Sequence, residues 1–75
     1  MTKAIQRRIA HLTEVLRDAE AECTRYVITA VREAEDPDPA AEERMARNLD
    51  EAFKHGRIAA QIKRQLAQLQ GEVTL

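Results

Sequence analysis

The sequence is poor in the large side chains from which most small domains build a core. It has no tryptophan and one residue each of phenylalanine (Phe53) and tyrosine (Tyr26), and 13 of its 75 residues are alanine, whereas Ile, Leu and Val together number 15. A lone domain of this size buries little apolar area and is only marginally stable. The composition therefore predicts that another copy or a partner supplies a second surface to bury against.

Other absences disfavour several classes of protein. The single cysteine, Cys23, excludes an internal disulfide and a cysteine-based zinc cluster, and it suits a reducing compartment. With two glycines, the chain contains no glycine-rich phosphate loop. No apolar run approaches the roughly 18 residues of a membrane span, and no continuous apolar segment follows the basic N-terminus. We therefore expect a cytoplasmic protein without a membrane span or export signal.

The first half of the chain carries an uninterrupted heptad pattern. Its apolar residues recur alternately four and three positions apart, at Ile5, Ile9, Leu12, Leu16, Ala19, Cys23, Tyr26 and Ala30. This spacing is typical of a helix that packs along one seam. Thr2 is a predicted N-cap, and residues 3–35 contain neither glycine nor proline. The pattern predicts one helix over residues 3–35.

The two prolines mark a turn and a second helix start. Pro37 disfavours helical geometry at the residue before it, while Asp38 is a predicted N-cap with Pro39 at the first helical position. Gly71 offers a C-terminal stop. Between them the apolar positions are Met45, Leu49, Ala52, Phe53, Gly56, Ala59, Ala60, Ile62, Leu66 and Leu69. We predict an all-α antiparallel two-helix hairpin, a single domain over residues 1–75, with a turn at 36–39 and a second helix over about 39–70.

Folding the chain about this turn pairs residues whose numbers sum to about 75. Ala19 then lies opposite Gly56, and Cys23 lies opposite Ala52. Small residues facing one another permit a close approach of the helices, which would explain a glycine inside a helix.

The apolar residues spread more widely than one seam requires. Near the turn they wrap around much of the first helix, and on the second helix Phe53 widens the stripe. One interpretation is that the additional apolar residues are simply exposed and have no function. We instead predict a second contact surface that forms a four-helix bundle with another copy or with a protein partner. The predicted interface residues are Leu12, Leu16, Tyr26, Val27, Val31, Leu49, Phe53, Ile62 and Leu66.

Charge is balanced overall but unevenly placed. Twelve basic against thirteen acidic residues give a net charge of −1, which does not favour binding to nucleic acid or membranes. An antiparallel pair of hairpins would place each basic end beside the acidic end of the other copy. The basic residues at the open end are Lys3, Arg7, Arg8, Lys63 and Arg64, and the acidic residues at the turn are Glu33, Glu35, Asp36, Asp38, Glu42 and Glu43.

Side chains capable of catalysis or metal binding do not converge in this layout. His11 with Glu14 and Glu51 with His55 share helix faces, but the two pairs lie at different levels of the hairpin. Cys23 has no partner at catalytic spacing. We expect no enzymatic activity, no metal site and no cofactor.

The near-equal helices, the proline-marked turn and the run LDEAFKHGRIAAQIKRQL at residues 49–66 together resemble a known layout. It is that of the small helical-hairpin co-chaperones of type III secretion needle subunits. The resemblance implies a bacterial cytoplasmic protein that pairs with a tetratricopeptide-like chaperone and keeps the needle subunit monomeric. The partner-facing residues would be Leu12, Leu16, Leu49, Phe53, Ile62 and Leu66.

Two alternatives share this architecture. One is a regulator of the plasmid copy-number type, an antiparallel dimer of hairpins that binds paired RNA loops through its basic ends. The other is a small phage-encoded inhibitor that occupies the interface of a host protein.

Overall fold

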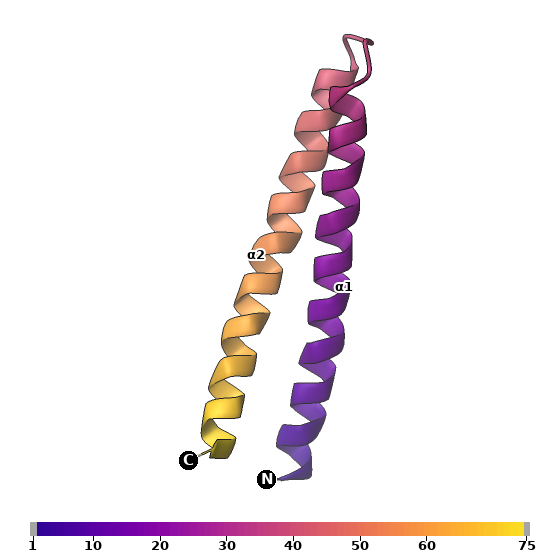
Figure 1. The fold of residues 1–75 in the computed structure, drawn as a ribbon. Coiled ribbons are helices and arrows are strands. Elements are labelled where there is room, and N and C mark those ends of the chain that lie inside the picture. The colour runs from indigo at the N-terminus through magenta and orange to yellow at the C-terminus, as the bar shows by residue number, and fades with distance from the viewer. Residues whose placement is uncertain (1, 75) are drawn as a thin grey trace.

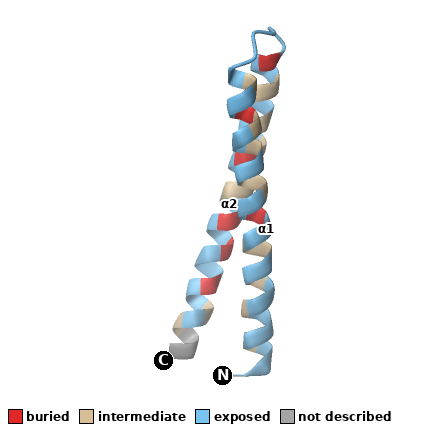
Figure 2. Cartoon of the chain, turned by 45° about the vertical axis from the view of Figure 1, so that its right-hand side comes forward, coloured by how far each residue is buried: buried red, intermediate tan, exposed pale blue. Residues whose placement is uncertain are grey.

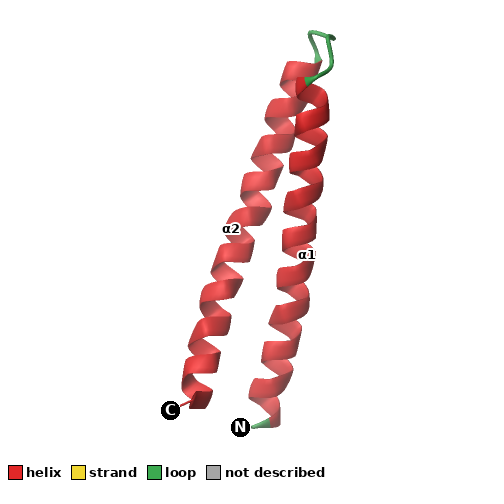
Figure 3. Cartoon of the chain, in the orientation of Figure 1, coloured by secondary structure: helices red, strands yellow, loops and turns green. Residues whose placement is uncertain are grey.

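The chain forms two long antiparallel helices joined by a short loop (Figure 1). The computed structural model describes residues 2–74, and the side chains of residues 2–71. Helix α1 spans Lys3–Ala34 and helix α2 spans Ala41–Thr74. The described residues contain helix and loop only (Figure 3), so the predicted all-α hairpin is confirmed.

The hairpin is markedly elongated. Its extents are 55 × 15 × 12 Å, and its radius of gyration is 16.9 Å, against about 11 Å for a compact domain of 75 residues. The loop lies at one end, and both termini lie at the other (Figure 1). Each helix therefore packs against one neighbour, and much of its circumference faces outward.

Helix α1 begins and ends close to the predicted residues. The Thr2 hydroxyl accepts a hydrogen bond from the Ile5 N–H at 3.3 Å, with Thr2 in an extended conformation, so the predicted N-cap is confirmed. At the other end the Glu35 N–H donates to the Arg32 carbonyl, which tightens the last turn. The helix ends at Ala34, one residue before the predicted end.

The loop is held by two aspartates that each bridge a proline. The Asp36 carboxylate accepts a hydrogen bond from the Asp38 N–H, and the Asp38 carboxylate accepts one from the Ala40 N–H, both at 3.0 Å. Such bonds to an N–H two residues on are Asx turns. The Asp38 carbonyl also accepts a hydrogen bond from the N–H of Ala41 at 2.9 Å, so Asp38 leads into the second helix as expected, although α2 starts at Ala41, two residues later than predicted.

The predicted stop at Gly71 is wrong, because α2 continues through it to Thr74. A glycine ends a helix when it adopts the left-handed conformation. No described glycine has a positive φ, so Gly71 stays right-handed and helical.

The predicted seam of α1 faces α2 as expected. All eight of its heptad positions are buried or partly buried. The seam of α2 differs from the prediction, because Leu49 and Phe53 are exposed while Asn48 and His55 are partly buried. The α2 residues that are buried or partly buried at heptad spacing are Ala41, Met45, Asn48, Ala52, His55, Ala59, Ile62, Leu66 and Leu69.

Side-chain size along the seam sets how closely the helices approach. In the half near the loop the buried residues are alanines, whereas in the open half the seam contains Leu12, Leu16, Ile62 and Leu66. Small facing residues allow a shorter distance between helix axes. Accordingly the two ribbons diverge toward the termini (Figure 1), and the buried residues follow the inner side of α2 (Figure 2).

The facing residues are displaced from the predicted register by about one helical turn. A Cβ built on Gly56 would lie 3.8 Å from the Cys23 sulfur, whereas the prediction placed Gly56 opposite Ala19. Side chains in a helix tilt toward its N-terminus. Each side chain therefore meets its partner at the level of an earlier residue of its own helix. For this reason the numbers of two contacting residues sum to more than 75. The stacked pair Tyr26 and His55 shows the same displacement.

Candidate functional site

The two sides of the seam have different chemistry. One side, which we call the polar face, carries Glu33, Arg44, Glu51, His55 and Tyr26. The other side, which we call the groove face, carries an apolar groove between the helices. The polar face satisfies its own polar groups, so the groove face is the candidate site.

Arg44 is the centre of the polar face near the loop. Its Nε donates to the Glu33 carboxylate at 2.9 Å, and its terminal nitrogens lie 3.4 Å from Asp36 and 3.7 Å from Asp38. The hydrogen bond to Glu33 raises the pKa of the Arg44 guanidinium above its ordinary value, with smaller contributions from the charges of the neighbouring carboxylates. Arg44 thus ties the end of α1, the loop and α2 together.

Tyr26 and His55 fill the middle of the polar face. Their rings stack with centroids 5.6 Å apart and planes 10° from parallel. The Arg25 guanidinium lies 5.1 Å from the centre of the Tyr26 ring, a cation–π geometry. His55 Nε2 also lies 3.9 Å from the Glu51 carboxylate. Tyr26, a predicted interface residue, is therefore already engaged within the hairpin.

The groove lies on the opposite side of the same seam and has a volume of about 310 Å³. Its base consists of the buried Ala52 and the partly buried Cys23 and Gly56, whose small side chains leave a depression between the helices. Exposed side chains stand around that depression, with Phe53 69% exposed. The residues around the base are Val27, Leu49, Phe53, Arg57 and Ala60.

The groove continues along the seam toward the termini. A second hollow of about 290 Å³ shares Cys23, Gly56 and Ala60 with the first and reaches Glu20 and Lys63. There the Lys63 ammonium lies 3.7 Å from the Glu20 carboxylate and bridges the two helices. From Leu49 to Lys63 the combined groove runs roughly 21 Å along α2, at 1.5 Å per residue. That length corresponds to about four turns of a docked helix.

The predicted interface residues divide into four groups. Val27, Leu49 and Phe53 line the groove, and Val31 is exposed on α1. Leu12 and Leu16 are partly buried against α2, as Tyr26 is against His55. Ile62 and Leu66 are 6% and 8% exposed, so their side chains are used inside the hairpin.

Several residues of the groove were not predicted to be part of it. Cys23, Ala52 and Gly56 were assigned to helix–helix packing, and Arg57 to none of the sites. The signal that could have found them is the strict alternation of four and three residues from Ala41 to Leu69 on α2. Taking that as the seam leaves Leu49, Phe53, Gly56 and Ala60 as a separate stripe beside it.

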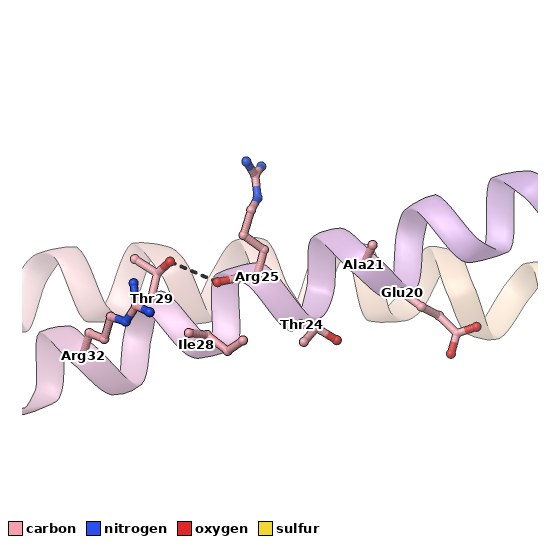
Figure 4. A pocket seen from close by; sticks show the side chains of 7 residues that line it. All are labelled: Glu20, Ala21, Thr24, Arg25, Ile28, Thr29 and Arg32. Atoms are coloured by element: carbon pink, nitrogen blue, oxygen red, sulfur yellow. Dashed lines mark hydrogen bonds between the residues drawn. The ribbon is translucent and has the colours of Figure 1, made fainter.

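A further depression lies on the outer side of α1 (Figure 4). All its lining residues come from this one helix, and the Thr29 hydroxyl donates to the Arg25 carbonyl at 3.0 Å instead of pointing to a ligand. The surface of a single helix is convex and cannot enclose a small molecule. The lining residues are Glu20, Ala21, Thr24, Arg25, Ile28, Thr29 and Arg32.

The side chains capable of chemistry lie apart from one another. Cys23 lies in the groove, whereas His55 stacks on Tyr26 on the polar face, and His11 is exposed on α1. In the described part of the chain, no group of three or more His, Cys, Asp or Glu side chains is placed to hold a metal ion. Neither described helix is long and apolar enough to cross a membrane.

Comparison with known proteins returned no relative: no protein-family model matches the chain, and neither a curated protein nor a solved structure is detectably similar to it.

Proposed function

We propose that the hairpin is a protein-binding module that receives an amphipathic helix of a protein partner in its groove. The observation that carries the proposal is the position of Phe53, which is 69% exposed beside a depression lined almost entirely by apolar atoms. Amphipathic helices dock into apolar grooves through side chains spaced three and four residues apart. An aromatic side chain at the centre of such a surface is a typical binding hot spot.

The accessible surface area of the hairpin supports the proposal that it packs against a partner. The chain exposes 5839 Å², whereas a compact monomer of 8.5 kDa exposes about 4,700 Å². The excess of roughly 1,100 Å² is comparable to the approximately 800 Å² that each partner buries in a stable interface of standard size. Covering the groove face would bring the exposed surface close to that of a compact protein.

A chaperone-like role follows if the partner is itself prone to aggregate. Helical subunits that polymerise expose apolar helix faces before assembly, and a groove that covers such a face would keep them apart. The resemblance to co-chaperones of type III secretion needle subunits suggests a partner of this kind. In this proposal the hairpin acts by shielding an apolar helix and uses no catalytic group.

The test is affinity capture from the source cell with the wild-type chain and with Phe53→Asp. The charged side chain should abolish capture of the partner, because its carboxylate would be desolvated in the groove. Ile58→Asp is the matched control, since Ile58 is 41% exposed and, nine residues after Leu49, projects from the opposite side of α2.

Capture that survives Phe53→Asp, with both variants helical by circular dichroism, would remove the groove from the function. Loss of capture in Ile58→Asp alone would place the binding surface on the far side of α2 instead.

A further inference from the structure

Helix α2 carries an acidic, an aromatic and a basic residue at equal spacing along one line. Glu42 precedes Phe53 by eleven residues, and Arg64 follows it by eleven. Eleven residues make almost three full turns of the helix. Each side chain of this series therefore projects from the helix in a direction only about 20° from that of the previous one. The same side of α2 carries the groove residues Leu49 and Ala60. Phe53 thus lies at the edge of the groove, and Glu42 and Arg64 lie beyond its two ends on the same side of α2.

The charges at the two ends of this line form no ion pair within the described part of the hairpin, although Glu42 lies in the first turn of α2, where the helix dipole favours a carboxylate. Glu42 and Arg64 are exposed, and neither takes part in an ion pair among the residues that the structure describes. By contrast, Arg44 and Lys63 each pair with a carboxylate of another segment. Two unpaired charges of opposite sign are thus placed symmetrically about an exposed aromatic ring.

We infer that a second copy of this chain occupies the groove, with its α2 antiparallel to the first α2 and a two-fold axis at Phe53. In that arrangement Glu42 lies level with Arg64 of the second copy, and the reverse contact is formed as well. The two Phe53 rings meet at the axis. Ala46 lies level with Ala60 of the second copy, so small residues flank the aromatic pair on both sides.

The symmetry distinguishes a second copy from other occupants. A two-fold antiparallel pair requires each residue on the line to be complementary to the residue at the same distance on the other side of the axis. A parallel pair would place Glu42 against Glu42, and like charges oppose association. A foreign helix requires no symmetry about Phe53 at all. The roughly 1,100 Å² of excess surface is large enough for the approximately 800 Å² that one copy buries in a stable dimer, as it is for a foreign partner.

This inference rests on the proposed function, because the same groove is used. It adds a regulatory consequence, because the second copy and a foreign helix compete for one surface. The free protein is then a dimer, and binding of a partner separates the two copies. Dissociation of the dimer then limits how fast a partner is captured.

The test uses two charge reversals measured by light scattering across a concentration series. Wild type should have twice the monomer mass of 8.5 kDa. Glu42→Lys alone and Arg64→Glu alone should each weaken dimerisation about tenfold or more, since each replaces two attractive contacts by repulsive ones. The double variant Glu42→Lys with Arg64→Glu should dimerise again, because the exchanged charges then attract each other in both contacts.

Glu43→Lys is the matched control. It makes the same charge change in the same helical turn but lies about 100° further round the helix, and it should leave the dimer intact. In a parallel pair each residue would lie against the same residue of the other copy. The double variant would then still place like charges against each other at both ends. Single variants that dimerise as wild type does, or a double variant no better than the single ones, would overturn the inference.

The outcomes separate the two proposals. A monomeric wild-type chain that still captures a protein through Phe53 would overturn the inference and leave the proposed function standing. A monomer whose capture of a partner ignores Phe53→Asp would overturn both. A dimer that persists in Phe53→Asp would place the contact between copies outside the groove, which also overturns the inference.

Discussion

At the scale of single residues, Gly56 is the position whose role the structure changes most. A glycine inside a helix costs about 1 kcal/mol relative to alanine, and close packing of α1 was the expected reason for it. A Cβ at this position would lie 3.8 Å from the Cys23 sulfur, which is an ordinary van der Waals distance. The hairpin itself therefore has room for alanine, and the space that Gly56 leaves belongs to the groove.

We expect Gly56→Ala to stabilise the hairpin by about 0.5–1 kcal/mol, because it restores helix propensity without a clash. The thermal midpoint should rise by roughly 4–8 °C per kcal/mol in a domain of this size. The measurement is thermal unfolding by circular dichroism in a Phe53→Asp background, so that association through the groove does not contribute. A lowered midpoint would mean that α1 needs the glycine after all.

At the scale of elements, α1 was easier to predict than α2 for a physical reason. On α1 the apolar residues form one heptad seam, so periodicity alone identifies the buried side. On α2 two stripes lie one residue apart, and in the middle of the helix, between residues 48 and 60, the stripe with Leu49 and Phe53 is the more apolar. The helix buries the other stripe, which includes Asn48 and His55. The stack of Tyr26 on His55 favours that choice, and a hydrophobic pattern contains no information about such a contact.

The loop and its arginine could not be predicted in detail either. The prolines and aspartates identify a turn, but only the three-dimensional arrangement brings Arg44 back to Glu33, Asp36 and Asp38. The position of Arg44, eight residues after Asp36 and eleven after Glu33, carries no recognisable local signature. This contact links the loop to both helices.

We expect Arg44→Gln to lower the thermal midpoint by a few degrees, because it leaves three neighbouring carboxylates without their cation. Arg47→Gln is the control, since Arg47 is exposed and forms no ion pair among the described residues. The difference between the two variants should shrink at high salt, where exposed charges are screened. Equal midpoints at low salt would show that the contacts of Arg44 do not stabilise the loop.

At the scale of the whole molecule, the core depends on very few large side chains. Of the described side chains that are buried, five are alanines and the others are Ile62 and Leu66. Burial of large apolar side chains provides most of the stability of a fold. The open half of the hairpin, where the helices diverge (Figure 2), contains both of the large buried side chains.

Leu66→Ala should destabilise the hairpin by about 2 kcal/mol or more, in line with other leucines truncated in a core. Ile58→Ala is the comparison, because Ile58 is exposed and its truncation should change stability by no more than about 0.5 kcal/mol. Denaturant unfolding followed by circular dichroism measures both. Similar midpoints for the two variants would show that the open ends of the helices are not packed together.

The difference between the two faces also determines how far an assembly of this protein can grow. On the polar face, Arg44 already pairs with carboxylates of the hairpin, and the rings of Tyr26 and His55 already stack on each other. The apolar groove lies on the other side of the seam. Contacts that are used up by a single partner give closed complexes, whereas contacts that leave a free copy of themselves propagate into fibres. An assembly that is held together by this groove alone is therefore closed as soon as the groove is covered.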